Sequence, residues 1–128
     1  MKKDIESKED IQLLVDTFYE TVKVDATIGY FFSDVTHVNW EKHLPIMYSF
    51  WENILFHTGT YAGNPMKTHM QLHEKSAMNT THFERWLEIF NHTVNSLFEG
   101  GNAELIKQRA LSIATTMQIK IVYKHPLV

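Results

Sequence analysis

Hydrophobic residues recur every three or four positions along most of this chain, which is the spacing of one face of an α-helix. The first such stretch predicts a helix from about residue 8 to 24. Ser7 followed by Asp10 resembles a capping box at its start, with Asp in place of the usual Glu. Tyr19 lies at the edge of the apolar stripe, so its ring is expected to point inward. The apolar positions of this stretch are Ile11, Leu14, Val15, Phe18 and Val22.

The next two predicted helices are separated by a connection at residues 33–38. Asp25 is expected to cap a short helix that includes Phe32. A longer helix is predicted to start at Asn39, but Pro45 lies inside it, and an internal proline removes a helix hydrogen bond. The helix is therefore either kinked at Pro45 or effectively begins near His43. Its apolar face is formed by His43, Leu44, Met47, Phe50, Trp51 and Ile54.

A glycine-containing loop at residues 59–64 precedes a predicted short helix that starts at Pro65. Asn64 can accept hydrogen bonds from the first free amides of this helix, and proline suits the first helical position. His69 lies one turn into the helix. Its imidazole is therefore expected to be held in a defined direction, as a metal ligand requires.

Two further helices are predicted in the last third of the chain. Thr80 or Thr81 is expected to cap the first, which carries Trp86 on its inward stripe and ends before residues 100–101. Asn102 is expected to cap the second.

No stretch has the alternating pattern of a strand, so the fold class is all-α, with about six helices. With 128 residues, 44% of them hydrophobic, the chain is interpreted as one domain spanning residues 1–128.

Composition excludes several classes of function. The net charge of −3 gives no electrostatic basis for binding nucleic acid or an anionic membrane, so neither partner is expected. The absence of Cys excludes a disulfide framework, a thiolate zinc site and an iron–sulfur cluster. No apolar run approaches the roughly 18 residues of a membrane span, and a cytoplasmic location is predicted. The chain is instead rich in His, Met and aromatic residues, which suit a large flat cofactor.

Three interpretations of the histidines are compared: a zinc site, a haem site and a helical domain without a cofactor. His69 and His73, four residues apart, have the spacing of a zinc site, but no third ligand or general base accompanies them in motif form. A single His that ligates a haem iron, with aromatic and sulfur side chains against the porphyrin, fits the pattern better. In a helical domain without a cofactor, Tyr19 would be a tyrosine at the edge of the core, bonded to a backbone carbonyl, and His43 a surface or capping residue.

Several motifs, in order along nearly the whole chain, resemble those of a truncated haemoglobin of the third group. The segments that carry this resemblance are Phe18-Tyr19-Glu20-x-Val22, Gly29 to Phe32, Trp40-x-x-His43-Leu44-Pro45-x-Met47-x-x-Phe50-Trp51, Tyr61-x-Gly63-x-Pro65-Met66-x-x-His69-x-x-Leu72-His73, His82-Phe83-x-Arg85-Trp86-Leu87-x-x-Phe90 and Ala110-x-x-Ile113-Ala114. The resemblance implies a truncated globin fold, in which a two-over-two helical sandwich surrounds a haem.

The resemblance also implies roles for individual residues. His69 would be the proximal ligand of the iron of haem b, whereas Tyr19 and Trp86 would donate hydrogen bonds to a ligand on the distal side. His43 would occupy the distal histidine position, and Phe32 would wedge the haem. The side chains expected to pack around the ring are Met47, Phe50, Trp51 and Met66, and those proposed to meet the propionates are Arg85, Lys67, Tyr61 and His73.

The implied function is binding of oxygen or another small diatomic ligand, with redox chemistry such as nitric oxide detoxification or peroxide handling. This reading requires an external electron donor, because the chain has no reductase domain. The alternatives are an oxygen-binding or gas-sensing module without turnover and, from a different class, a helical interaction domain without a cofactor. A monomer is expected.

Overall fold

The computed structural model describes residues 2–35, 38–59 and 78–120. Regular structure in these ranges is helical throughout and without a strand, which confirms the all-α prediction. The elements are α1 (Lys8–Lys23), the π-helix η1 (Phe31–Val35), α2 (Trp40–Phe56), α4 (Thr80–Leu97) and α5 (Gly101–Gln118). The short helix predicted from Pro65 lies outside the described residues. No helix in the described ranges is long and apolar enough to cross a membrane.

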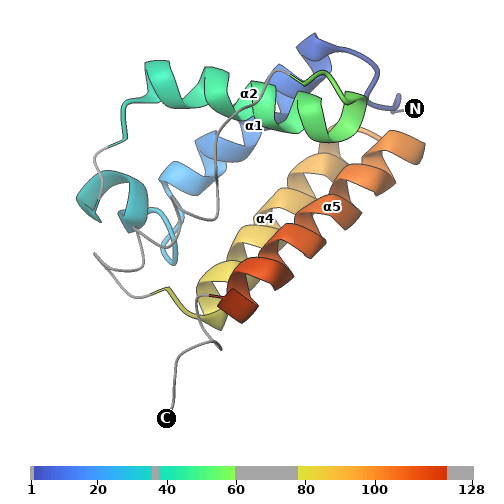
Figure 1. Cartoon of the computed structure of the whole chain (residues 1–128). Helices are drawn as coiled ribbons and strands as arrows, with labels where there is room; N and C mark the ends of the chain where they lie inside the picture. The colour runs from blue at the N-terminus through green and yellow to red at the C-terminus, as the bar shows by residue number, and fades with distance from the viewer. Residues whose placement is uncertain (1, 36–37, 60–77, 121–128) are drawn as a thin grey trace.

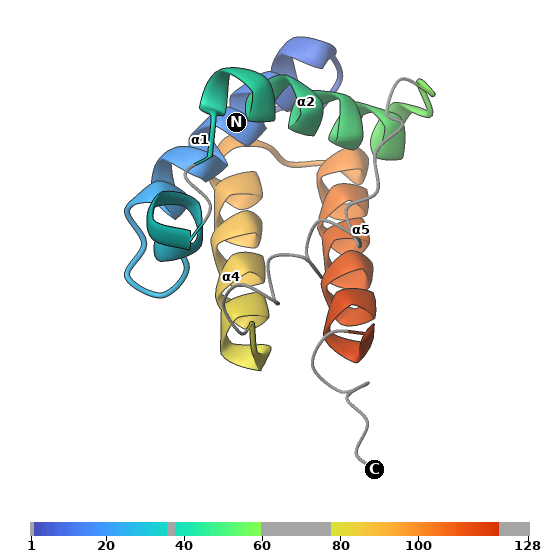
Figure 2. The same ribbon diagram turned by 60° about the vertical axis from the view of Figure 1, so that its left-hand side comes forward.

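The four α-helices in the described ranges form two layers (Figure 1). Helix α1 packs against both α2 and α4, α4 packs against α5, and α2 also contacts α5. Figure 2 shows α4 and α5 side by side on one side of the molecule, with α1 and α2 crossing them on the other. The core lies between the layers, and its largest fully buried side chains are Phe90, Ile5, Ile11, Leu14, Ile106, Val15, Val22 and Val94.

Helix α1 begins as predicted. The Asp10 amide donates to Ser7 Oγ (3.3 Å), and the Asp10 carboxylate accepts from the Ser7 amide (3.2 Å), so both halves of the capping box are present. After α1, the Asp25 carboxylate accepts from the amides of Thr27 and Ile28 (3.0 and 3.1 Å), so Asp25 caps the turn that leads into η1 rather than the predicted helix. The segment that follows forms a π-helix, a form that sequence periodicity did not indicate.

Helix α2 begins directly after Asn39, whose side chain accepts from the Glu41 amide (3.1 Å). The start near His43 that Pro45 suggested is therefore wrong, and Pro45 stands inside the helix. The cap explains this result, because Asn39 satisfies a first-turn amide while Pro45 forfeits only a single hydrogen bond further on.

The predicted caps of the last two helices are wrong by one or two residues. Asn79 caps α4 rather than Thr80 or Thr81, because its side-chain oxygen accepts from the His82 amide (3.3 Å). Helix α5 starts at Gly101, one residue before Asn102, with Gly100 at the cap position and no side-chain bond from it.

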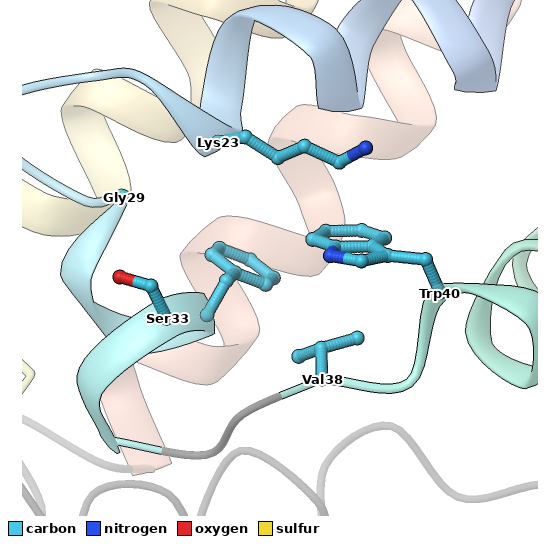
Figure 3. Close-up of a pocket in the computed structure, with 6 residues that line it drawn as sticks. Lys23, Gly29, Ser33, Val38 and Trp40 are labelled. Atoms are coloured by element: carbon cyan, nitrogen blue, oxygen red, sulfur yellow. The ribbon is translucent and has the colours of Figure 1, made fainter.

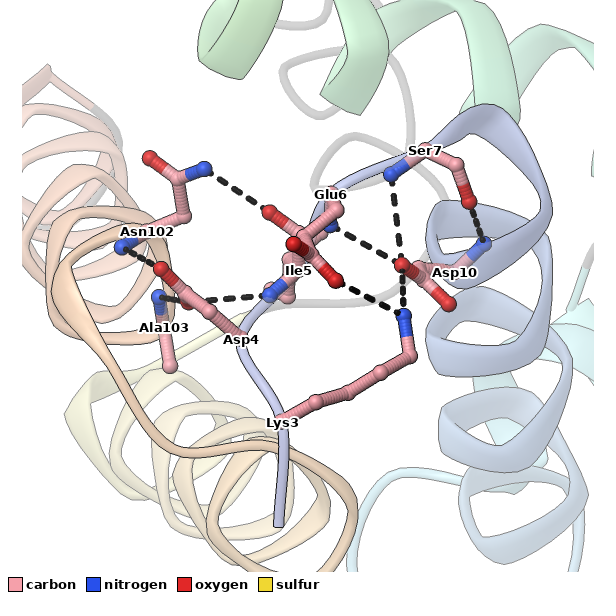
Figure 4. A network of polar contacts seen from close by, with 8 residues as sticks. All are labelled: Lys3, Asp4, Ile5, Glu6, Ser7, Asp10, Asn102 and Ala103. Atoms are coloured by element: carbon pink, nitrogen blue, oxygen red, sulfur yellow. Dashed lines mark hydrogen bonds and ion pairs between the residues drawn. The ribbon is translucent and has the colours of Figure 1, made fainter.

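The cap of α5 comes instead from the chain's N-terminal segment (Figure 4). The Asp4 carboxylate accepts from the amides of Asn102 and Ala103, each at 2.9 Å. Gly100 (φ 147°) makes this approach possible, since a Cβ at that position would lie 2.5 Å from Asp4 Cγ. Asn102 therefore lies inside the helix, held by a residue from the other end of the sequence.

Candidate functional site

Tyr19 is the point at which three elements meet. Its ring, on α1, is only 6% exposed. It contacts Phe32 of η1 (ring centroids 5.9 Å apart) and both Trp40 (5.3 Å) and His43 (5.2 Å) of α2. The prediction that Tyr19 points inward is confirmed, and the structure brings it together with two other predicted site residues, Phe32 and His43.

The surroundings of Tyr19 determine its chemistry. Burial raises the pKa of the phenol, so the hydroxyl stays protonated and can donate. Within the described part of the chain, neither a side chain nor a backbone group forms a hydrogen bond with this hydroxyl. A buried tyrosine normally has such a partner. The backbone bond expected for a tyrosine that only fills the core is not seen among these residues.

A second group of rings surrounds Phe90 on α4. Phe90 stacks with Trp51 of α2 (4.9 Å) and with Trp86 (5.4 Å). Phe18 joins the two groups, since its centroid lies 4.9 Å from that of Tyr19 and 5.7 Å from that of Trp86. Phe18 therefore contacts both Tyr19 and Trp86.

The remaining predicted ring contacts lie along α2. His43 is half-buried and its ring meets that of Trp40 at 5.6 Å. Phe50 is buried, and Met47 packs half-buried against the core. Spacings of four and three residues place His43, Met47 and Phe50 on one face of the helix.

Trp40 was missed as a site residue by the sequence prediction. Its ring stacks on Phe32 (5.7 Å), and the Lys23 ammonium lies 4.5 Å from its centroid. The only available signal was its position three residues before His43, on the same helix face.

A pocket of about 310 Å³ opens beside these rings (Figure 3). Phe32 and Trp40, which line it, also contact Tyr19. Its lining residues are Lys23, Gly29, Phe32, Ser33, Val38 and Trp40.

Arg85 lies outside both ring groups. Its guanidinium contacts Asp25 through Nε (2.8 Å) and Nη2 (2.7 Å), and it also pairs with Glu88. Burial by itself raises the pKa of Asp25, but the Arg85 hydrogen bond and the turn amides outweigh it and lower that pKa. Arg85 thus ties α4 to the turn after α1, and it would have to exchange a carboxylate in order to meet a haem propionate.

Two predicted site residues, Met66 and His69, lie outside the described residues, together with Tyr61, Lys67 and His73. Their roles remain predictions. The described ranges contain no group of three or more His, Cys, Asp or Glu side chains that could hold a metal ion.

Comparison with known proteins identifies the family. No protein-family model matches the chain. A curated relative, Group 3 truncated hemoglobin ctb of Campylobacter jejuni, is 30% identical over an alignment of 128 positions that covers 98% of each chain. The chain belongs to the group 3 truncated haemoglobins. A crystal structure of group III truncated hemoglobin from Campylobacter jejuni has the same fold, with a TM-score of 0.84 and 28% identity over 99% of this chain and 100% of that one.

Membership of this haemoglobin family implies haem-based binding of a small ligand. The described residues fit such a group. Aromatic rings form apolar surfaces, and the protonated Tyr19 hydroxyl is a donor without a partner among them. His43 and the Trp86 indole add two further nitrogen-bearing side chains within the same ring groups.

Proposed function

We propose that this truncated haemoglobin binds haem b through His69 and binds oxygen or another diatomic ligand on the opposite face. Tyr19, His43 and Trp86 are the residues assigned to that face. The observation that carries the proposal is Tyr19, whose ring is buried among other rings and whose protonated hydroxyl has no hydrogen-bond partner among the described residues.

When bound, haem supplies an iron with an exchangeable position for the diatomic ligand. Tyr19 contributes a fixed O–H donor toward that position. The rings of Phe32 and Trp40 restrict the access of water to the phenol, which strengthens any hydrogen bond it makes. A hydrogen bond to a charged acceptor is worth roughly 1.5–3 kcal/mol, which corresponds to about 10-fold to 100-fold in the dissociation rate.

Retention of the ligand favours redox chemistry over transport. A carrier must release its ligand, whereas a donor of this strength holds a ligand that carries negative charge. The proposed activity is therefore turnover of oxygen, nitric oxide or peroxide with an external electron donor. The second candidate is a non-enzymatic oxygen-binding or gas-sensing module, for which slow release is equally suitable.

Ultraviolet–visible spectroscopy of the purified protein tests this proposal. The dithionite-reduced protein should have a Soret band that shifts on exposure to carbon monoxide. His69→Ala should abolish stable haem retention, because a neutral imidazole is the proposed iron ligand. His73→Ala is the matched control and should retain haem. Equal haem content in the two variants would overturn the ligand assignment, and a wild-type protein that takes up no added haem would overturn the function.

A further inference from the structure

His82 occupies the third position of α4, where a capping box usually has Glu or Gln. The Asn79 amide donates to His82 Nδ1 (3.1 Å), and the His82 amide donates to Asn79 Oδ1 (3.3 Å). Because Nδ1 accepts a hydrogen bond, it carries a lone pair and no proton. The cap therefore selects the neutral imidazole with its proton on Nε2.

The other nitrogen of the same ring points to a different element. His82 Nε2 lies 3.4 Å from the Tyr30 hydroxyl, to which the Nε2 proton can be donated. The ring also meets Phe31 edge-on, with centroids 4.9 Å apart. Tyr30 and Phe31 directly precede Phe32 in the chain. One neutral imidazole thus joins the first turn of α4 to the start of η1.

The contact of His82 with Tyr30 and Phe31, called here the His82 joint, connects two segments that carry residues of the ring groups described above. Trp86 lies four residues after His82, one turn further along the same face of α4. Phe32, next to Phe31, contacts Tyr19. The distance between α4 and η1 therefore determines where the Trp86 indole lies relative to Phe32 and Tyr19.

We propose that neutral His82 is a positioning residue that fixes the positions of Trp86 and Phe32 relative to each other in the ligand pocket. Protonation of His82 weakens the contact between α4 and η1 and lets these two side chains move. The proposal rests on the proposed function, because Trp86 and Phe32 are assigned to the haem pocket there. Protonated Nδ1 can no longer accept from the Asn79 amide, so the capping box loses one of its two bonds.

Among residues 2–35, 38–59 and 78–120, few charged groups are near this imidazole. On the η1 side, Tyr30 supplies a neutral hydroxyl, and Asp34 is exposed and accepts from Ser33. On α4, Glu84 is exposed, and Arg85 is paired with Asp25 and Glu88. Burial lowers the pKa of His82. A positive charge in the first turn of a helix is also unfavourable, because the helix N-terminus is itself positive.

These effects fix the direction of the pH dependence. The pKa of His82 in the folded chain lies below its usual value, so the unfolded chain binds more protons at mildly acidic pH. The contribution of His82 is complete above about pH 6.5 and is lost as the pH falls towards the folded pKa.

His82→Gln is the decisive variant, because Gln keeps a side-chain acceptor at this capping position and does not titrate. His82→Ala removes the acceptor at every pH. Oxygen dissociation should change by about two- to tenfold between roughly pH 7.5 and pH 5.5 in the wild type, the equivalent of one ordinary hydrogen bond. The His82→Gln rate should change distinctly less, and the His82→Ala rate should match the acidic wild type throughout. The same pH dependence in wild type and His82→Gln would overturn the proposal.

Nuclear magnetic resonance of the imidazole nitrogens in the full-length chain separates this inference from the proposed function. It should find a protonated Nε2, an unprotonated Nδ1 and a pKa below about 6.5. A protonated Nδ1 at neutral pH would contradict the inference, whether or not the protein takes up haem. A chain that shows the expected tautomer but retains no haem would leave the His82 joint intact and overturn the ligand pocket instead.

Discussion

Polar atoms are bonded differently in two regions of the molecule. One region is the junction between the N-terminal segment and α5, and the other is the ring cluster around Tyr19. In the junction the Asp4 carboxylate accepts from three backbone amides, those of Ile5, Asn102 and Ala103 (Figure 4). In the ring cluster the Tyr19 hydroxyl has no partner among the described residues. Polar groups whose hydrogen bonds are all made within the protein fix the geometry of a fold, whereas a donor without a protein partner is available to a ligand.

The Asp10 carboxylate at the start of α1 is, like that of Asp4, bonded by several donors. It accepts from Lys3 Nζ (2.5 Å) and from the amides of Glu6 (2.9 Å) and Ser7 (3.2 Å). Burial raises its pKa, but these donors together lower it. The hydrogen bonds of the junction therefore stabilise the fold. Substitutions there should alter the free energy of unfolding and leave ligand binding unaffected.

Gly100→Ala should break the junction most severely. The new Cβ would lie 2.5 Å from Asp4 Cγ, and the backbone has a φ of 147° that side chains rarely adopt. The expected loss is roughly 2–4 kcal/mol in the free energy of unfolding, measured with guanidinium chloride. Gly101→Ala is the matched control, because no atom lies within 4 Å of its added Cβ, and its unfolding free energy should stay close to that of the wild type. Equal effects of the two substitutions would contradict the described approach of Asp4.

Asp4→Ala should cost less, about 1 kcal/mol, the usual value of a helix cap. Burial raises the pKa of Asp4, but the amides of Asn102 and Ala103 outweigh it and lower the pKa overall. The stabilisation is therefore present above about pH 3.9 and is lost as the pH falls through the folded pKa. Unfolding measured against pH should show this loss in the wild type and not in Asp4→Ala. Glu9→Ala, at an exposed position, serves as the control.

Two tyrosines provide the smallest test of the comparison. Tyr48 on α2 donates to Asp16 on α1, and burial together with this bond raises its pKa to about 12. Tyr48→Phe should therefore lower the unfolding free energy by about 0.5–1.5 kcal/mol. Tyr19→Phe in the haem-free protein should change it by less than about 0.5 kcal/mol, because the hydroxyl makes no hydrogen bond to the described residues that could be lost. A larger loss for Tyr19→Phe would mean that its hydroxyl already has a protein partner.

Local signals predicted the elements well. The capping box at Ser7 and the Asn39 cap involve residues two or three positions apart, so the starts of α1 and α2 can be inferred from short sequence patterns. The α5 cap could not be inferred in this way, because Asp4 and Asn102 are separated by 98 positions. The α4 cap was missed because the side chain that bonds back to the Asn79 backbone is His82, where a capping box usually has Glu or Gln.

The site was predicted in part for the same reason. Helical spacing placed Tyr19 on the buried face of α1, which the structure confirms. Trp40 and the Arg85–Asp25 pair depend on contacts between elements, which periodicity within one helix does not predict. For Trp40, periodicity indicates only a helix face shared with His43.

The oxygen dissociation rate of Tyr19→Phe, compared with wild type and Tyr48→Phe, tests the central claim most directly. If the Tyr19 hydroxyl donates to the ligand, its removal should accelerate dissociation by about 10-fold or more, the value of a hydrogen bond to a charged acceptor. Tyr48→Phe, which disturbs the tie between α1 and α2, should leave the rate close to that of the wild type. An unchanged rate in Tyr19→Phe would contradict the account and make Trp86 or His43 the donor.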